Sequence, residues 1–240
     1  MAKKGKQNWI FGKHAVEAAL EFGRRPIYEL WISHEEKELE HAARAKNIPL
    51  RFGNRKDFDK RFPNKVHQNV AANVGPLEQP ALEDVMDKEL LLILDQITDP
   101  HNLGAILRSA DAFGCGAVIL PANHSAPISD VTAKAASGAL ETVPIVTVPN
   151  LVQALKKLKD NEYWSVGLTA HTNQILEQVD LKGKMVIVMG SEGDGMRRLV
   201  EENCDFLAKL PMVGTVESLN VSVATAISLY EAQRQRTRKK

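Results

Sequence analysis

Residues 90–120 read LLLILDQITDPHNLGAILRSADAFGCGAVIL, and this stretch decides the fold class. The apolar runs 90–94 and 117–120 are continuous, which is typical of strands that are buried on both faces. Between them, residues 103–113 have apolar side chains at helical spacing. A buried strand, a helix and a second buried strand predict one repeat of a parallel sheet.

The same alternation continues beyond residue 120. Four more apolar runs predict buried strands, at residues 145–148, 164–168, 185–189 and 206–210. Segments with helical spacing lie between and after them, at residues 131–140, 151–158, 196–203 and about 219–236. Strands that alternate with helices predict an α/β fold, with a parallel sheet and helices on both of its faces.

Residues 9–74 contain shorter elements of both kinds. Strands are predicted at residues 27–32, near Leu50 and Phe52, and at 70–74; helices are predicted at residues 14–21, 36–46 and 57–62. Residues 75–88 contain Pro76 and Pro80 and show no strong period, which is typical of a linker. We therefore expect a small α/β domain at 1–74, a linker at 75–88 and a second domain at 89–240.

The composition excludes several classes of protein. The chain has 240 residues, 44% of them hydrophobic, which is enough for a core. No run approaches the roughly 18 consecutive apolar residues of a membrane helix, and no apolar segment follows the basic start, so we expect neither a membrane span nor a secretion signal. The cysteines Cys115 and Cys204 form no CxxC pair and the seven histidines are scattered. We therefore expect no disulfide, no metal site and a cytoplasmic location.

Basic residues are clustered, although the formal net charge is only +1. The clusters are Lys3, Lys4 and Lys6; Arg51, Arg55, Lys56, Lys60, Arg61 and Lys65; and Arg234, Arg236, Arg238, Lys239 and Lys240. Such clusters can bind phosphates electrostatically. From charge alone a solvated, solubilising terminus is the simpler explanation, and both interpretations stay open.

Ligands of open parallel sheets bind beyond the carboxyl ends of the strands, and three segments of this chain place polar residues there. The first is DQITDPHNLG, residues 95–104, followed by Arg108 on the predicted helix. Asp99 or Asn102 can cap this helix, with Pro100 in its first turn. Capping alone would explain the polar residues, and Arg108 can be an ordinary surface arginine.

The second segment is MGSEGDGM, residues 189–196, between a predicted strand and a predicted helix. Its three glycines let backbone amides approach a ligand closely. It lacks the Lys-Ser/Thr of a phosphate-binding loop, and Glu192 and Asp194 would repel phosphates. A cationic or zwitterionic ligand therefore fits better than a nucleoside triphosphate, although a tight turn without a ligand would need the same glycines.

The third segment is LPMVGTVESLNVSVA, residues 210–224, in which a strand ends and a nearly all-apolar helix begins. Ser218 is a candidate N-cap, which would place Asn220 in the first turn. A helix this apolar must be buried, either against the sheet or against a second subunit. Both polar residues can be explained as caps alone.

Together the three segments resemble the three motifs of the SpoU (TrmH-type) RNA 2′-O-methyltransferases, in the same order and at the same spacing. Residues 9–74, with FGKHAV at 11–16 and VHQNVA at 66–71, are similar to the ribosomal-protein-L30-like (L30e-like) domain of members that methylate guanosine in bacterial 23S rRNA. The departures are Asn69 for the usual Gly, Leu210 for Ile and Ser191 for Ala. None of them removes a functional side chain.

The resemblance implies a fold, a cofactor and a set of site residues. It implies S-adenosylmethionine as cofactor, a C-terminal trefoil knot of the SPOUT kind, a homodimer formed through the knotted domain, and RNA as substrate. Arg108 would act on the ribose 2′-hydroxyl, as base or as electrostatic stabiliser. The residues that orient Arg108, ribose and cofactor would be Asn102, Glu192, Ser218 and Asn220. Cofactor-binding residues would be Gly190, Glu192, Gly193, Gly195, Leu210, Met212, Gly214, Ser218 and Leu219.

The resemblance leaves alternatives within and outside this class of enzyme. A tRNA 2′-O-methyltransferase and an antibiotic-resistance rRNA methylase share the motifs. A non-catalytic RNA-binding protein on the same fold would not need the complete set of polar motif residues. The L30-like domain favours rRNA, most specifically a guanosine in 23S rRNA, because the tRNA enzymes generally lack it.

Overall fold

The computed structural model describes residues 8–216 and 218–237. The basic residues Lys3, Lys4, Lys6, Arg238, Lys239 and Lys240 lie outside the described residues. The chain forms two compact units. The small unit comprises the residues up to Glu78 together with Ile128–Thr142, and the large unit comprises Gln79–Pro127 together with Val143–Lys240.

A four-stranded sheet in the order β1-β4-β2-β3 forms the centre of the small unit. Its strands are β1 (Asn8–Phe11), β2 (Ile27–Ile32), β3 (Leu50–Phe52) and β4 (Val70–Val74). The sequence did not predict β1, which pairs antiparallel with β4. The sheet is mixed, because β2 runs antiparallel to β4 but parallel to β3.

Helices cover both faces of this sheet, because alternate residues of its strands point to opposite sides. The helices are α1 (Lys13–Phe22), α2 (Lys37–Ala45) and α3 (Arg55–Arg61). Leu30 and Ile32 pack with α1 and α2, whereas Trp31 packs with Phe58 of α3. Helix α1 ends at Gly23, which adopts the left-handed conformation with φ 62°.

One segment of the small unit comes from the middle of the chain. Helix α5 (Asp130–Ala136) is shorter than the predicted helix at 131–140, because Ser137 adopts the left-handed conformation with φ 50° and ends it. Beyond the helix, the carboxylate of Glu141 is buried and pairs with the buried guanidinium of Arg25. No sequence pattern indicated that residues 128–142 would join this unit.

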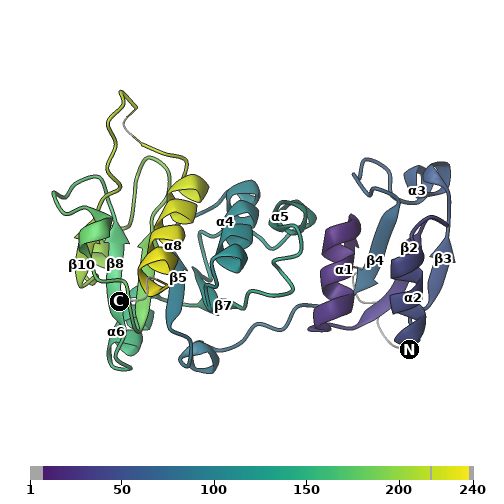
Figure 1. The fold of residues 1–240 in the computed structure, drawn as a ribbon, viewed down its shortest axis with the longest axis horizontal. Coiled ribbons are helices and arrows are strands. Elements are labelled where there is room, and N and C mark those ends of the chain that lie inside the picture. Colours follow the sequence, from purple (N-terminus) through teal and green to yellow (C-terminus); the bar gives the residue numbers. More distant parts are fainter. Residues whose placement is uncertain (1–7, 217, 238–240) are drawn as a thin grey trace. The chain divides into compact units, whose positions relative to one another are not determined.

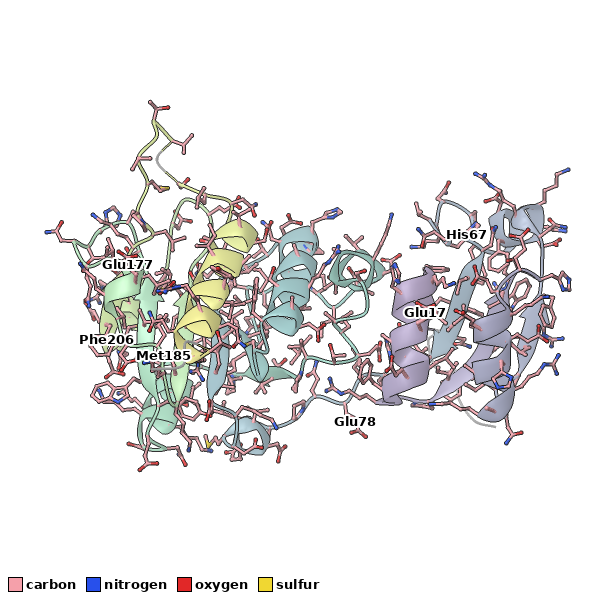
Figure 2. All side chains as sticks on the ribbon, in the orientation of Figure 1. Glu17, His67, Glu78, Glu177, Met185 and Phe206 are labelled. Atoms are coloured by element: carbon pink, nitrogen blue, oxygen red, sulfur yellow. The ribbon has the colours of Figure 1, made fainter. Side chains whose placement is uncertain are left out.

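The large unit confirms the predicted α/β fold class. Its six-stranded sheet has the order β10-β8-β9-β5-β6-β7, and each neighbouring pair is parallel. The strands are β5 (Leu90–Leu94), β6 (Ala117–Pro121), β7 (Ile145–Val148), β8 (Trp164–Leu168), β9 (Met185–Met189) and β10 (Phe206–Ala208). Met185 and Phe206 begin their strands and lie toward the same edge of the sheet (Figure 2). We call the side of the sheet at which the strands begin the amino edge, and the side at which they end the carboxyl edge.

Helices lie on both faces of the large sheet. They are α4 (Pro100–Ala112), α6 (Leu151–Lys159), α7 (Arg198–Glu201) and α8 (Val221–Thr237), with short 3-10 turns at Leu82–Val85 and Leu176–Gln178. Figure 1 shows α8, in yellow, beside α4. Helices α6 and α7 belong to one core cluster with Leu91 and Ile93 of β5. Helix α7 is much shorter than the predicted helix at 196–203: it begins after its N-cap Arg197 and ends before its C-cap Glu202.

Residues 75–88, which we expect to form the linker, include buried apolar side chains. Leu82 and Val85 are part of the core cluster of the large unit. The boundary between the compact units falls between Glu78 and Gln79. The second half of this segment is therefore packed structure.

Among the described residues, no helix is both long enough and apolar enough to cross a membrane.

Candidate active site

A tight glycine loop follows β9 at the carboxyl edge of the large sheet. Within this loop, residues 190–196, Ser191 and Gly195 exchange two backbone hydrogen bonds, of 3.0 and 3.1 Å. Gly193 and Gly195 have φ values of +90° and +69°, in the region that favours glycine. The loop is therefore a narrow turn closed by its own backbone.

Gly190 is required by the loop itself. A Cβ atom at this position would lie 2.1 Å from the carbonyl carbon of Gly195 and 2.2 Å from the amide nitrogen of Met196. A Cβ on Gly193 would meet no described atom within 4 Å. From the sequence we expected all three glycines to permit close approach of a ligand; for Gly190 the close approach is to the chain's own backbone.

A cavity of about 580 Å³ lies beside this loop, within the volume range of small-molecule sites. Its walls come from residues 168–171, 189–196 and 209–212, and from Ile175, Glu201, Ser218, Leu219, Val221 and Ala224. The predicted cofactor-binding residues that line it are Gly190, Glu192, Gly193, Gly195, Leu210, Met212, Ser218 and Leu219. Gly214 is exposed and is not among the lining residues.

The wall formed by residues 168–171 was not predicted from the sequence. These residues follow β8, whose neighbour in the sheet is β9. Carboxyl ends of adjacent parallel strands meet at one edge, so the end of β8 and the loop after β9 form one crevice. Only the strand order, which the sequence does not state, could have identified Thr169 and His171.

Side chains from the three motif segments meet in one hydrogen-bond cluster. Nδ2 of Asn220 donates to Oδ1 of Asn102 at 3.0 Å and also to Oε1 of Glu192. The same Glu192 oxygen accepts the backbone N–H of Val221, at 2.9 Å. A carboxylate is stabilised there because Val221 is the first residue of α8, where the helix dipole is positive. Asn102, Glu192 and Asn220 therefore hold the starts of α4 and α8 and the glycine loop together.

The caps of the two helices differ in how well they were predicted. Asp99 caps α4, as one of the two alternatives proposed, and accepts the N–H of His101 at 2.9 Å. Asn220, not Ser218, caps α8: its side chain accepts the N–H of Ser222 at 2.9 Å. Ser218 lies before the helix and lines the cavity.

Arg108 stands apart from this cluster. It is exposed on α4, and within the described part of the chain its guanidinium has neither an ion pair nor a hydrogen bond. It follows Asn102 by six positions, about 240° around an ideal helix, so the two side chains leave α4 in different directions. The structure brings Asn102, Glu192 and Asn220 together and leaves Arg108 facing solvent.

In residues 8–216 and 218–237, no group of three or more His, Cys, Asp or Glu side chains could hold a metal ion.

Two family models match the chain, and together they cover most of it. Residues 89–230 match the SpoU rRNA Methylase family, and residues 9–80 match the family described as RNA 2′-O ribose methyltransferase substrate binding. The chain belongs to the SpoU rRNA methylase family. The SpoU match includes the glycine loop, the cavity walls and the Asn102–Glu192–Asn220 cluster.

Curated relatives of this SpoU chain are similar over nearly their whole length. The 23S rRNA (guanosine-2′-O-)-methyltransferase RlmB of Pseudomonas aeruginosa is 45% identical over 240 residues, which cover 95% of this chain and 96% of that protein. RlmB of Escherichia coli K12 is 44% identical over 239 residues, covering 95% and 98%.

Solved structures of SpoU enzymes have the same fold. The SpoU methyltransferase AviRb from Streptomyces viridochromogenes, in complex with AdoMet, has a TM-score of 0.81 and 26% identity, covering 95% of this chain and 89% of that chain. The TrmH/SpoU tRNA modifying enzyme of A. aeolicus has a TM-score of 0.57 and 32% identity, but covers only 64% of this chain and 81% of its own.

Proposed function

We propose that the protein transfers the methyl group of S-adenosylmethionine to the ribose 2′-hydroxyl of a guanosine in 23S rRNA. The observation that carries the proposal is the cavity of about 580 Å³ whose walls include the second and third SpoU motif segments. The curated relatives that are similar over nearly the whole chain are named for this reaction.

The cavity suits the chemistry of the cofactor. Glu192, Asp194 and Glu201 bring carboxylates to its wall, where they can attract the sulfonium and ammonium groups of S-adenosylmethionine. Leu210 and Met212 bring apolar side chains, which can cover the adenine. Bound S-adenosylmethionine supplies a methyl group on an already activated sulfur.

The chain's own residues supply orientation and charge. The Asn102–Glu192–Asn220 cluster holds the glycine loop against the starts of α4 and α8, and so keeps the cavity in shape. We assign contact with the 2′-hydroxyl to Arg108, whose solvent-facing guanidinium can reach an RNA that arrives from outside. A guanidinium is not deprotonated in proteins and has no acceptor atom. Its role is therefore to stabilise the developing alkoxide electrostatically.

We assign phosphate binding in the small unit to α3. Arg51 pairs with Glu29, Arg55 pairs with Asp59 at 3.9 Å, and Lys65 pairs with Asp130. The Arg61 guanidinium lies 5.5 Å from the ring centre of Trp9. Lys56 and Lys60 are exposed and form no ion pair with a described residue. These two lysines are therefore the cations of this cluster that are available to RNA phosphates.

The described part of the C-terminal basic cluster is used by the fold instead. Arg234 forms two hydrogen bonds with Glu231, of 2.7 and 2.8 Å. Arg236 pairs with Glu89 at 3.0 Å and donates to the carbonyl of Gly183 at 2.6 Å. We therefore propose no phosphate contact for these two arginines.

We propose that the protein is a homodimer formed through α8. Val223, Ile227 and Tyr230 are exposed and recur at intervals of four and three residues, on one side of this helix. An apolar stripe of this kind is usually covered by a partner, and the family resemblance implies a second copy. From the same resemblance we propose that the C-terminal segment forms a trefoil knot. We propose a cytoplasmic location from the two cysteines, which form no CxxC pair.

The test is methyl transfer to defined RNAs. The purified protein is incubated with methyl-labelled S-adenosylmethionine and either 23S rRNA or tRNA, and the labelled nucleoside is identified. We expect 2′-O-methylguanosine in 23S rRNA. Label only in tRNA would replace the proposal with the tRNA alternative, and RNA binding without any transfer would favour the non-catalytic alternative.

A further inference from the structure

A fully buried carboxylate, Asp95, lies at the carboxyl edge beside the glycine loop. It follows β5 directly and has no exposed surface. Its backbone N–H donates to the carbonyl of Met189, at 2.8 Å, so it sits next to the end of β9. A buried charge is costly to desolvate unless hydrogen bonds compensate it.

Among the described residues, the hydrogen-bond donors to this carboxylate all belong to Arg197. The backbone N–H of Arg197 donates to Oδ2 at 2.8 Å, and its Nε donates to Oδ1, also at 2.8 Å. A second guanidinium nitrogen lies 2.8 Å from Oδ1. Both oxygens of Asp95 are therefore occupied by one residue, 102 positions later in the chain.

Arg197 directly follows the glycine loop. The other end of the loop, Gly190, continues from β9, which is fixed in the sheet. The Asp95 carboxylate fixes the second end by holding the backbone amide as well as the side chain of Arg197. The residues between these anchors, Glu192 and Gly193 among them, line the cavity.

We infer that Asp95 is a positioning residue for the cofactor: by clamping Arg197 it holds the glycine loop in the shape that binds S-adenosylmethionine. This inference rests on the proposed function. Only the Asp95 side of this ion pair is buried, because the Arg197 side chain is 42% exposed, so the pair is weak evidence for stability. It does specify geometry, since a paired guanidinium and carboxylate fit in few orientations.

The neighbouring residue provides a matched control. Arg198 pairs with Glu202 at 2.8 Å, but both side chains are exposed and both lie at or next to α7. An exposed pair of this kind contributes little. Substitution of Arg198 therefore replaces the arginine next to Arg197 and leaves the contact between Arg197 and Asp95 in place.

The experiment compares Asp95→Asn with Arg198→Ala in the full-length protein. Asparagine keeps the shape of the side chain, but it loses the charge and replaces one accepting oxygen with an NH2 donor. We expect the Kd for S-adenosylmethionine, measured by calorimetry, to rise about 10-fold or more in Asp95→Asn. We expect it to stay within about 2-fold in Arg198→Ala.

Kinetics separate positioning from a general loss of structure. A misplaced loop raises the KM for S-adenosylmethionine and leaves kcat at saturating cofactor within about 3-fold. A purely structural defect lowers the active fraction, and hence kcat, at unchanged KM. Unchanged KM and Kd in folded Asp95→Asn would overturn the inference.

Arg197→Lys covers the case in which Asp95→Asn does not fold. It keeps the positive charge and the backbone hydrogen bond but removes the two-nitrogen contact, so we expect an intermediate rise in Kd. Wild-type affinity in this variant would also overturn the inference. Wild-type protein that binds no S-adenosylmethionine would instead refute the proposed function, so the two failures are distinguishable.

Discussion

The two edges of the large sheet both carry an aspartate held by hydrogen bonds, but the donors come from different places. At the carboxyl edge, Asp95 is held by Arg197, at the end of a loop that lines the cavity. At the amino edge, Asp205 precedes β10 and accepts hydrogen bonds from Ser165 of β8, at 2.8 and 3.0 Å, and from Lys159 of α6. One aspartate fixes a loop and the other joins elements of the framework.

Other polar contacts at the amino edge also join parts of the framework. The hydroxyl of Tyr163 donates to the carbonyl of Lys88. Arg236 ties the end of α8 to Gly183 and Glu89. Burial raises the pKa of the Cys204 thiol in this region to about 12, so it stays protonated and unreactive at neutral pH. The comparison indicates that substitutions at the amino edge change stability, whereas those at the carboxyl edge change cofactor binding and catalysis.

The largest effect is expected for Arg108→Ala. Turnover should fall about 100-fold or more, the range for removing one preorganised catalytic group. The affinity for S-adenosylmethionine should stay within about 3-fold, because Arg108 does not line the cavity. Single-turnover methylation of rRNA, with calorimetry of cofactor binding, measures both. Near-normal turnover would show that Arg108 is only a surface residue.

A pair of glycine substitutions tests the two edges directly. Gly190→Ala forces a Cβ into the backbone of the loop and should weaken cofactor binding about 10-fold or more. Gly183, at the amino edge, has φ +67° and no described atom within 4 Å of a Cβ. Gly183→Ala should therefore cost about 1–2 kcal/mol of stability through its backbone conformation and leave the Kd unchanged. If both variants changed the Kd for S-adenosylmethionine equally, the carboxyl edge would not differ from the amino edge in its effect on cofactor binding.

A smaller effect is expected when Lys56 and Lys60 are both replaced by Ala. RNA affinity should fall, and the slope of log affinity against log salt should decrease by about 1 for each phosphate that the variant no longer neutralises. Titrations at several salt concentrations measure the slope. Lys182→Ala, an exposed lysine of the large unit, is the control and should have the wild-type slope.

Point substitutions are preferable here to deletion of residues 1–88. That deletion would also remove Leu82 and Val85 from the core of the large unit. It would leave the buried carboxylate of Glu141 without Arg25. A loss of RNA binding could then come from damage to the remaining structure.

The smallest effect is expected for Asp205→Asn, as the amino-edge counterpart of Asp95→Asn. Burial raises the pKa of Asp205, but hydrogen bonds from Lys159 and Ser165 outweigh burial and bring it below its ordinary value. A lowered pKa stabilises the fold fully above the unfolded value near 3.9, and this stabilisation is lost as the pH falls through the folded-state pKa.

Thermal unfolding against pH measures this contribution. Asp205→Asn should lower the melting temperature by about 2–4 °C at neutral pH, and the difference from wild type should shrink below pH 4. Cofactor affinity should not change. A raised Kd for S-adenosylmethionine would show that the amino edge also controls the cavity.

The accuracy of the sequence predictions follows from how each element is stabilised. The bounds of β5, β7, β8 and β9 were predicted correctly, because strands of a parallel sheet are recognisable as short apolar runs, and this held even for β7 at the end of the strand order. The short strand β1 was missed, since its four residues are defined by pairing with β4, more than fifty positions away. The N-cap Asp99 was among the predicted alternatives, because capping is a local interaction.

The sequence by itself determined the α/β class, most element positions, the family and the three motif segments, of which the second and third line the cavity. Only the tertiary structure decided the strand order, the wall at residues 168–171 and the attachment of Asp95 to Arg197. Apolar periodicity and helix caps are properties of neighbouring residues, so they can be recognised in one stretch of chain. A buried carboxylate acquires its role from the donor that packing places beside it, and here that donor lies 102 residues away.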